Sequence, residues 1–196
     1  MNESERIGVL GGTFDPIHNA HLDLARAALE SANLDRVIFV VAARPPHKTG
    51  DIVATAEQRL DMVRAAVAGN PHMEASDLEI CRSGPSYTAD TLEDLQERYP
   101  DAQLHLIMGM DSLLDLPGWR DPKRILNSAR LLAVHRDSAE VEIPHELEGH
   151  YDLMPFEPTN ISSTDLRRKL ASGEDVSAVL PKNVETVAKR EHIYGA

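Results

Sequence analysis

The chain has little that would suit a secreted, membrane-spanning or disulfide-linked protein. Cys81 is the single cysteine of 196 residues, which excludes an internal disulfide and a thiolate metal cluster and favours a reducing compartment. No apolar run approaches the length of a membrane span, and the polar start "MNESER" lacks the basic and apolar regions of a signal peptide. We therefore expect a cytoplasmic protein that does not associate with membranes.

Positive charge is also scarce. Asp and Glu outnumber Lys and Arg by 32 to 20, and the resulting net charge of −12 should repel nucleic-acid phosphates over most of the surface. Nucleic acid is therefore not an expected partner. An anionic ligand would have to bind in a small, locally positive pocket of helix termini, backbone amides and a few cationic side chains.

Apolar segments alternate with helical patterns along the chain. Short apolar runs predict strands over residues 6–11, 36–43, 73–80, 103–109 and 130–135. Helical spacing predicts helices over residues 19–34, 55–69, 88–99, 121–129, 162–173 and 181–194, with Thr55 and Gln58 spaced as a capping box. This alternation predicts a Rossmann-like α/β fold: a doubly wound parallel sheet with helices on both faces and a helical C-terminal segment. The length favours a single domain over residues 1–196, and residues 136–150 read as an irregular surface segment.

The first strand leads into "GVLGGTFDPIHNAH", residues 8–21, which is the most informative stretch. Gly11 and Gly12 remove side chains where the strand gives way to a helix, so a ligand can approach backbone N–H groups at the positive end of the helix dipole. His18 and His21 are three residues apart and can direct two imidazoles at one anionic group. This arrangement favours phosphate, although neither the dinucleotide nor the phosphate-loop spacing is present. The alternatives are a plain tight turn with surface histidines, or a zinc site that would lack an evident third ligand.

The segment "GGTFDPIHNAH" resembles the first signature of the nucleotidyltransferase superfamily, and "ISSTDLR" (161–167) resembles its second. Between them, "PPHK" (45–48), "SYTADTL" (86–92) and "GMDSLLDLPGW" (109–119) resemble segments of the bacterial nicotinate-nucleotide adenylyltransferases, in the same order. The resemblance covers nearly the whole chain.

This resemblance implies an enzyme of NAD biosynthesis that joins nicotinate mononucleotide to the AMP portion of ATP and releases pyrophosphate. It implies catalytic roles at the phosphates for His18, His21 and Arg167. It also implies magnesium bound mainly through the ATP phosphates, without a metal-binding cage of protein ligands.

The remaining substrate contacts are implied by the same segments. The family pattern assigns substrate binding to Gly11, Gly12, Thr13, Phe14, His47, Lys48, Tyr87, Thr88, Gly109, Asp111, Trp119, Ser163 and Thr164. Several of these have a structural alternative. Thr88, Asp111 and Ser162 or Ser163 could simply cap helices, and Trp119 could pack in the core.

One residue departs from the family pattern: Ala20 stands where the signature has glycine. If the backbone approaches ATP closely there, the methyl group would loosen ATP binding. This leaves open a catalytically silent nucleotide-binding protein, and a phosphopantetheine adenylyltransferase is the nearest enzymatic alternative. The sequence also leaves open a homo-oligomer and the preference for the acid or amide mononucleotide.

Overall fold

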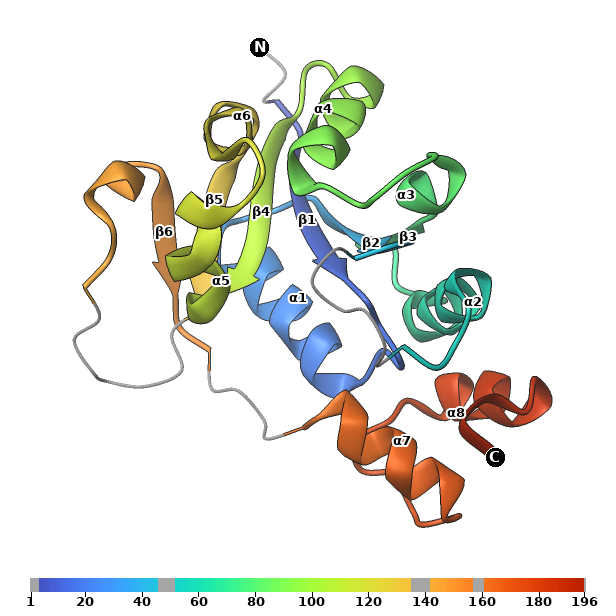
Figure 1. The fold of residues 1–196 in the computed structure, drawn as a ribbon. Helices are drawn as coiled ribbons and strands as arrows, with labels where there is room; N and C mark the ends of the chain where they lie inside the picture. Colours follow the sequence, from blue (N-terminus) through green and yellow to red (C-terminus); the bar gives the residue numbers. More distant parts are fainter. Residues whose placement is uncertain (1–3, 46–51, 135–141, 157–160, 196) are drawn as a thin grey trace. The chain divides into compact units, whose positions relative to one another are not determined.

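Six strands form one sheet in the order β3-β2-β1-β4-β5-β6 (Figure 1). The strands are β1 Arg6–Gly12, β2 Arg36–Val41, β3 Met73–Ser76, β4 Gln103–Gly109, β5 Arg130–Val134 and β6 Tyr151–Met154. The pairings of β1 with β4, β4 with β5 and β5 with β6 are parallel. The strand order reverses at β1, as in a doubly wound sheet, so the predicted fold class is confirmed.

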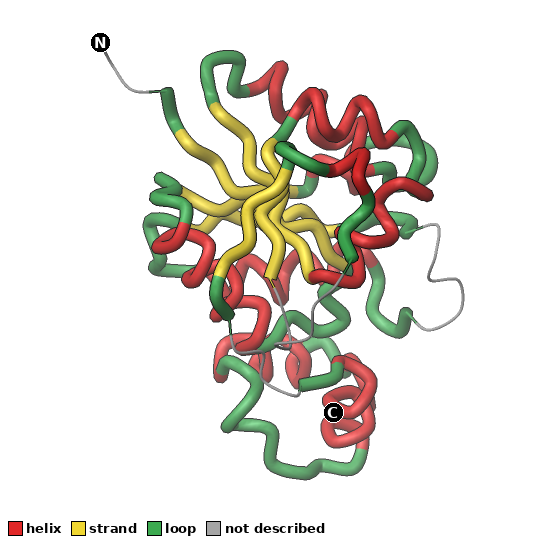
Figure 2. Tube along the Cα trace, turned by 90° about the vertical axis from the view of Figure 1, so that its left-hand side faces the viewer, coloured by secondary structure: helices red, strands yellow, loops and turns green. Residues whose placement is uncertain are grey.

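The computed structural model describes residues 4–45, 52–134, 142–156 and 161–195. The helices are α1 Asn19–Ser31, α2 Ala56–Val67, α3 Leu78–Cys81, α4 Thr88–Arg98, α5 Met110–Asp115, α6 Pro122–Ser128, α7 Ser163–Ala171 and α8 Lys182–Arg190. Short 3₁₀ segments lie at η1 Leu116–Gly118, η2 His145–Leu147 and η3 Ile193–Gly195. Figure 2 traces the helices in red and the strands in yellow.

The chain forms two compact units. Unit 1 comprises Met1–Leu10, Leu24–Ile38 and Tyr87–Pro158, and unit 2 comprises Gly11–Asp23, Phe39–Ser86 and Thr159–Ala196. Both units take residues from β1, β2 and α1. A single domain over residues 1–196 stays a prediction.

Unit 1 is built on the parallel ladder of β1, β4, β5 and β6. Strands β4 and β5 are almost wholly buried, as expected for parallel strands covered on both faces. Gly8 is required within this core, because a Cβ there would lie 2.8 Å from Leu34 and 2.9 Å from Ile107. Side chains of the connection between α1 and β2 and of β4 therefore fill the space beside β1.

Unit 2 is organised around α2, which packs against β3 and α8. The predicted capping box at its start is confirmed: the Gln58 backbone N–H donates to Thr55 Oγ1 at 3.2 Å, and the Thr55 N–H donates to Gln58 Oε1 at 3.0 Å. The C-terminal segment forms α7 and α8 as predicted, and η3 packs against both.

Three local predictions differ from the structure. The strand expected over residues 73–80 ends at Ser76, where the Ser76 hydroxyl accepts the Leu78 N–H at 3.3 Å and α3 begins. Strand β6 was not predicted, because "YDLM" is short and largely exposed and depends on its neighbour β5 for its ladder. Helix α5 was also missed, since its six residues are too few to show a helical period.

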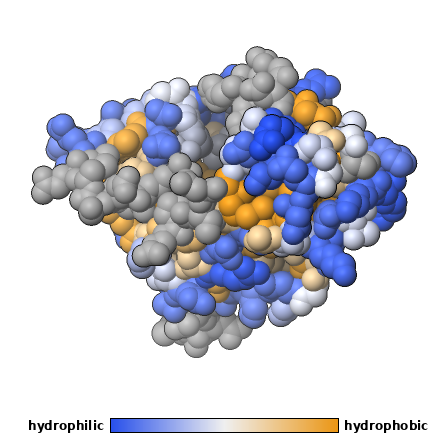
Figure 3. All heavy atoms as spheres, turned by 90° about the horizontal axis from the view of Figure 1, so that it is seen from below, coloured by the Kyte–Doolittle hydropathy of each residue, from blue (hydrophilic) through white to orange (hydrophobic). Residues whose placement is uncertain are grey.

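The surface is mostly hydrophilic on the face shown in Figure 3, where apolar residues gather in a smaller area. Among the described residues, no helix combines the length and apolar character that crossing a bilayer requires.

Candidate active site

Gly11 and Gly12 end strand β1, and the side chain of Phe14 packs beside them in unit 2. Phe14 is buried in a left-handed backbone conformation with φ of 51°. A Cβ on Gly12 would lie 2.7 Å from the Phe14 ring, so glycine is needed there to admit that ring. A Cβ on Gly11 would meet nothing within 4 Å, which leaves its exposed backbone open to an incoming group. Gly12 therefore makes room for the Phe14 ring, whereas Gly11 leaves the backbone accessible.

The Phe14 ring also orients the second histidine of the motif. It packs against Phe39, and its centroid lies 5.1 Å from that of His21 in an edge-to-face arrangement. His21 in turn stacks on His18, with centroids 3.8 Å apart and ring planes at 30°. The predicted pairing of His18 and His21 is therefore present, although α1 begins only at Asn19 and His18 precedes it.

Backbone hydrogen bonding defines the tautomer of His21. The backbone N–H of His18 donates to Nδ1 of His21 at 3.2 Å, so this nitrogen serves as the acceptor. In a neutral imidazole the proton then resides on Nε2. His21 is half-buried and can present an N–H to an anion through this Nε2.

His18 is held neutral by its surroundings. It is only 5% exposed, and burial lowers its pKa to about 4. Its Nδ1 is buried and has no hydrogen-bond partner among the described residues. At pH 7 the imidazole can therefore offer an aimed N–H to a phosphate oxygen but carries no charge. The structure therefore favours a neutral N–H donor over an imidazolium at His18.

The depressed pKa of His18 predicts how stability depends on pH. The unfolded chain takes up a proton near the ordinary pKa of 6.5 but the folded chain only near 4, so unfolding binds a proton between these values. The free energy of unfolding should therefore fall by up to about 1.4 kcal/mol per pH unit as pH drops through this window. Urea unfolding of the wild type and His18→Asn from pH 7 to pH 4.5 measures the effect. The variant should lose less stability, and parallel curves would contradict this account.

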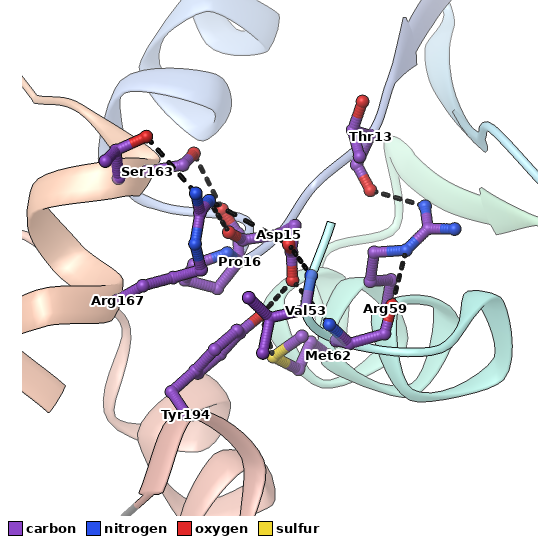
Figure 4. Close-up of polar contacts among 11 residues, drawn as sticks. Thr13, Asp15, Pro16, Val53, Arg59, Met62, Ser163, Arg167 and Tyr194 are labelled. Carbon is purple, nitrogen blue, oxygen red and sulfur yellow. Dashed lines mark hydrogen bonds and ion pairs between the residues drawn. The ribbon is translucent and has the colours of Figure 1, made fainter. Parts of the chain in front are cut away.

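Helix α7 brings the second signature onto the first. Ser163 Oγ donates to the Pro16 carbonyl at 3.4 Å, and Arg167 Nη1 donates to the Asp15 carbonyl at 2.9 Å (Figure 4). Arg167 Nη2 also donates to Thr164 Oγ1 at 3.2 Å. Residues about 150 positions apart in sequence are thus in direct contact within unit 2. The first turn of α7 supplies free backbone N–H groups beside these side chains.

The Asp15 carboxylate connects four segments of unit 2. Its Oδ2 accepts the Val53 N–H at 2.8 Å, and its Oδ1 accepts the Ala54 N–H at 3.1 Å and the Tyr194 hydroxyl at 2.6 Å (Figure 4). Arg167 Nη1 lies 3.8 Å from Oδ2. Burial, and the hydrogen bond to Asp15 and its negative charge, raise the pKa of Tyr194, so its phenol remains a donor. Residues 13–18, which connect β1 to α1, are called the histidine turn below. The Asp15 carboxylate therefore links this turn to the start of α2, to α7 and to the C-terminal segment.

Arg59 is a fully buried cation on the other side of the turn. Its Nη1 donates to the carbonyls of Thr13 and Ala42, both at 2.7 Å, and its Nε donates to Ala54 at 3.3 Å. Burial lowers its pKa, and the nearby Asp15 carboxylate opposes that shift. An arginine at 1% exposure retains its charge through these partners.

Sequence reasoning missed the roles of Asp15, Arg59 and Tyr194. The sequence assigned no role to the Asp15 carboxylate, and Arg59 lies in an ordinary amphipathic helix. Tyr194 is 179 positions from Asp15, so no local spacing links them. The available signal was Asp15 itself, the single acidic residue of "GGTFDPIHNAH".

A second group of predicted residues lies in unit 1. Tyr87 and Thr88 stand at the start of α4, and the Arg120 guanidinium carbon lies 4.5 Å from the centre of the Tyr87 ring. This contact brings Tyr87 to the segment that carries Trp119. Trp119 is only half-buried, so its ring is not enclosed in the core as the alternative required. Arg120 was not predicted as part of this group.

Gly109 and Asp111 lie where β4 ends and α5 begins, as expected for the carboxyl end of a parallel strand. Gly109 is the N-cap of α5 and has open space around it, while Asp111 is exposed in the first turn. His47 and Lys48 lie outside the described residues.

The capping alternatives are not supported by the structure. The N-cap of α4 is Tyr87 rather than Thr88, and that of α5 is Gly109 rather than Asp111. Ser162 is the N-cap of α7, but its side chain makes no capping hydrogen bond. Thr88, Asp111 and Ser163 are therefore not the N-cap residues of their helices.

No group of three or more His, Cys, Asp and Glu side chains within residues 4–45, 52–134, 142–156 and 161–195 is arranged to hold a metal ion. The donors gathered around the histidine turn are N–H and guanidinium groups, which suit anions.

Comparison with known proteins finds relatives that match most of this chain. Residues 9–169 match the family model described as cytidylyltransferase-like. A probable nicotinate-nucleotide adenylyltransferase of Thermus thermophilus is 43% identical over 96% of this chain and 99% of its own length. One from Thermomicrobium roseum is 38% identical over 96% of this chain and 91% of its own length.

Solved structures agree in fold. The Plasmodium falciparum nicotinic acid mononucleotide adenylyltransferase complexed with NaAD has a TM-score of 0.78 and covers 97% of this chain and 98% of its own, at 17% identity. A putative nicotinate-nucleotide adenylyltransferase from Vibrio parahaemolyticus has a TM-score of 0.70 at 20% identity and covers 97% of this chain and 95% of its own. By the family model and the extent of these sequence matches, the chain belongs to the cytidylyltransferase-like family, within its nicotinate-nucleotide adenylyltransferase group.

Proposed function

We propose that this chain transfers the AMP portion of ATP to nicotinate mononucleotide and releases pyrophosphate in NAD biosynthesis. The observation that carries the proposal is the contact between the two signatures: the stacked His18 and His21 follow a turn on which Arg167 is anchored. The family relationship supplies the substrates. Cys81 is exposed and free of disulfides, which suits a reducing compartment, and we place the enzyme in the cytoplasm.

The proposed chemistry needs no side-chain base, because the attacking phosphate is already an anion at neutral pH. Its oxygen forms a bond to the α-phosphorus of ATP, and the bond from that phosphorus to the bridging oxygen breaks, so that pyrophosphate leaves with the electron pair. Catalysis then depends on alignment and on stabilising charge in the transition state. Neutral His18 and His21 donate N–H groups to phosphoryl oxygens, which stabilises this charge without requiring prior protonation.

Arg167, Ser163 and Thr164 form the second phosphate contact in this proposal. The guanidinium and the N-terminus of α7 would meet the outer phosphates, which become the leaving pyrophosphate. Magnesium would enter with ATP and supply additional positive charge. The donor set around the turn fits phosphate oxygens rather than the metal itself, so no residue is assigned as a metal ligand.

The family pattern assigns mononucleotide binding to the unit 1 group and, separately, to His47 and Lys48, which lie outside the described residues. Trp119 stacks on the pyridine ring in this proposal, while Tyr87 and Thr88 offer donors to the carboxylate. Gly109 and Asp111 are assigned to the ATP ribose. These roles follow the family pattern, and the half-buried position of Trp119 supports its part.

A substrate panel tests the proposal. Purified protein is supplied with ATP and magnesium and with nicotinate mononucleotide, nicotinamide mononucleotide or phosphopantetheine, and pyrophosphate is measured. Turnover should be fastest with one of the two pyridine mononucleotides, and their ratio gives the acid or amide preference. Turnover only with phosphopantetheine, or ATP binding without pyrophosphate release, would overturn the assignment.

Trp119→Ala should weaken mononucleotide binding. Stacking of a base on an aromatic side chain is worth about 1–3 kcal/mol, so the KM for the mononucleotide should rise roughly five- to hundred-fold. The KM for ATP should change much less. Steady-state kinetics with each substrate varied in turn separates the two effects, and an unchanged mononucleotide KM would remove Trp119 from the site.

A further inference from the structure

A polar hollow lies within unit 1, away from the carboxyl end of β4. It has a volume of about 440 Å³, and its wall includes Arg6, Gln103, His105, Asn127, Arg130 and Asp152. Arg6, Gln103 and Arg130 are the first residues of β1, β4 and β5 (Figure 1). The hollow therefore opens at the amino ends of these strands, whereas Gly109 and Asp111 follow the opposite end of β4. Its lining contains none of the proposed catalytic or substrate-binding residues that the structure describes.

Arg6 is a cation without a carboxylate partner there. Among the described residues, its guanidinium makes one polar contact, from Nη2 to His105 Nε2 at 3.4 Å, and enters no ion pair. Its Nε is buried and has no hydrogen-bond partner. A buried donor that stays unpaired is costly and uncommon in a native protein, and a missing bound group is one explanation for it.

His105 holds Arg6 in place without neutralising its charge. His105 is 5% exposed, and burial, with a smaller contribution from the positive charge of Arg6, lowers its pKa. Its Nδ1 lies 3.2 Å from the Gln103 carbonyl, so in the neutral ring Nδ1–H donates there. Nε2 is then the acceptor that faces Arg6.

The other two charges of the hollow cancel each other. Arg130 Nε and Nη2 each donate to one carboxylate oxygen of Asp152 at 2.7 Å. Arg130 Nη1 also donates to the Gly149 carbonyl, and Nη2 donates to the Tyr151 carbonyl. All three guanidinium nitrogens of Arg130 therefore have acceptors within the protein. Asp152 is therefore committed to Arg130, and Arg6 leaves one uncompensated positive charge in a chain of net charge −12.

We propose that this hollow binds a small oxyanion through Arg6, specifically a phosphate group, free or as the monoester of a small metabolite. A guanidinium pairs with phosphate through two parallel hydrogen bonds, and the side-chain amides of Gln103 and Asn127 add neutral donors on the same wall. Rotation of the Arg6 side chain toward the anion would give the orphaned Nε its partner. The proposal does not depend on the proposed function.

Calorimetric titration with inorganic phosphate tests this site. The nucleotide and mononucleotide sites are first saturated with a nonhydrolysable ATP analogue and nicotinate mononucleotide, so that phosphate reports on the remaining site. Wild-type protein should bind phosphate, and Arg6→Gln should weaken the binding about tenfold or more, the range expected for a charge-assisted contact. Arg98→Gln removes an exposed arginine of α4 and serves as the control, which should bind as the wild type does. Ribose 5-phosphate in a parallel titration distinguishes a monoester from free phosphate as the tighter ligand.

Two outcomes would overturn the proposal. One is equal phosphate affinity in the wild type and Arg6→Gln, or no binding by the wild type at tens of millimolar. The other is a loss of melting temperature in Arg6→Gln that is the same with and without phosphate, which would mean that Arg6 has only a structural role. Arg6→Lys keeps the positive charge but lacks the paired N–H donors of the guanidinium, so it should retain part of the phosphate affinity. This variant replaces Arg6→Gln if Arg6→Gln does not fold. If the two substrates fail to bind, the proposed function is in error while the phosphate titration still reports on Arg6.

Discussion

Replacing His18 by alanine should lower kcat by about 10²- to 10³-fold, the loss seen when one transition-state donor is removed from an enzyme. The structure gives the reason. His18 is buried, neutral and stacked on His21, so its N–H is held in one orientation before substrate arrives. Donors that need no reorganisation act most strongly on charge that develops in the transition state. Pyrophosphate release under saturating ATP and mononucleotide measures the effect.

His145→Ala is the matched control for this experiment, because its imidazole is 95% exposed and lies outside the proposed site. It should leave kcat within about twofold, as expected for an exposed position. The His18→Ala protein should keep its mononucleotide KM, which shows that the rest of the site is intact. If its kcat stays close to that of the wild type, His18 has no catalytic role.

Asp15→Asn should be the most destabilising single change in unit 2, by about 3–5 kcal/mol, the cost of removing one partner of a buried ion pair. The amide keeps the shape of the side chain but turns one oxygen into a donor, which would face the N–H of Val53 or the donors at Oδ1. Arg59 and Arg167 would also lose their nearby negative charge. Urea unfolding monitored by circular dichroism measures the loss.

Tyr194→Phe provides a graded version of the same test, since it removes one donor to Asp15 and keeps the ring. It should cost about 1 kcal/mol or somewhat more, because the Asp15 oxygen still accepts the Ala54 N–H. Tyr151→Phe in β6 is the matched control, as its hydroxyl has no hydrogen bond among the described residues, and it should unfold as the wild type does. If Asp15→Asn costs no more than Tyr194→Phe, the carboxylate charge contributes nothing to this network.

Much of the architecture could be predicted from local pattern. Glycine at the end of an apolar run and the helical spacing that follows depend on neighbours in sequence, so β1, α1 and the Thr55 capping box were predictable. Strand β6 was not, because its four residues carry little apolar signal and pair only once β5 is in place. Helix α3 likewise begins at a turn that the hydroxyl of Ser76 stabilises.

The sequence by itself determined the fold class, the positions of the two nucleotidyltransferase signatures and the family to which the chain is similar, since these depend on residue types at short, regular spacings. Only the tertiary structure decided that His18 is neutral, that Gly12 accommodates Phe14, and that Asp15 joins Tyr194 and Arg167. The physical reason is that desolvation and long-range hydrogen bonds depend on which distant groups share a buried space, and spacing along the chain carries no record of that.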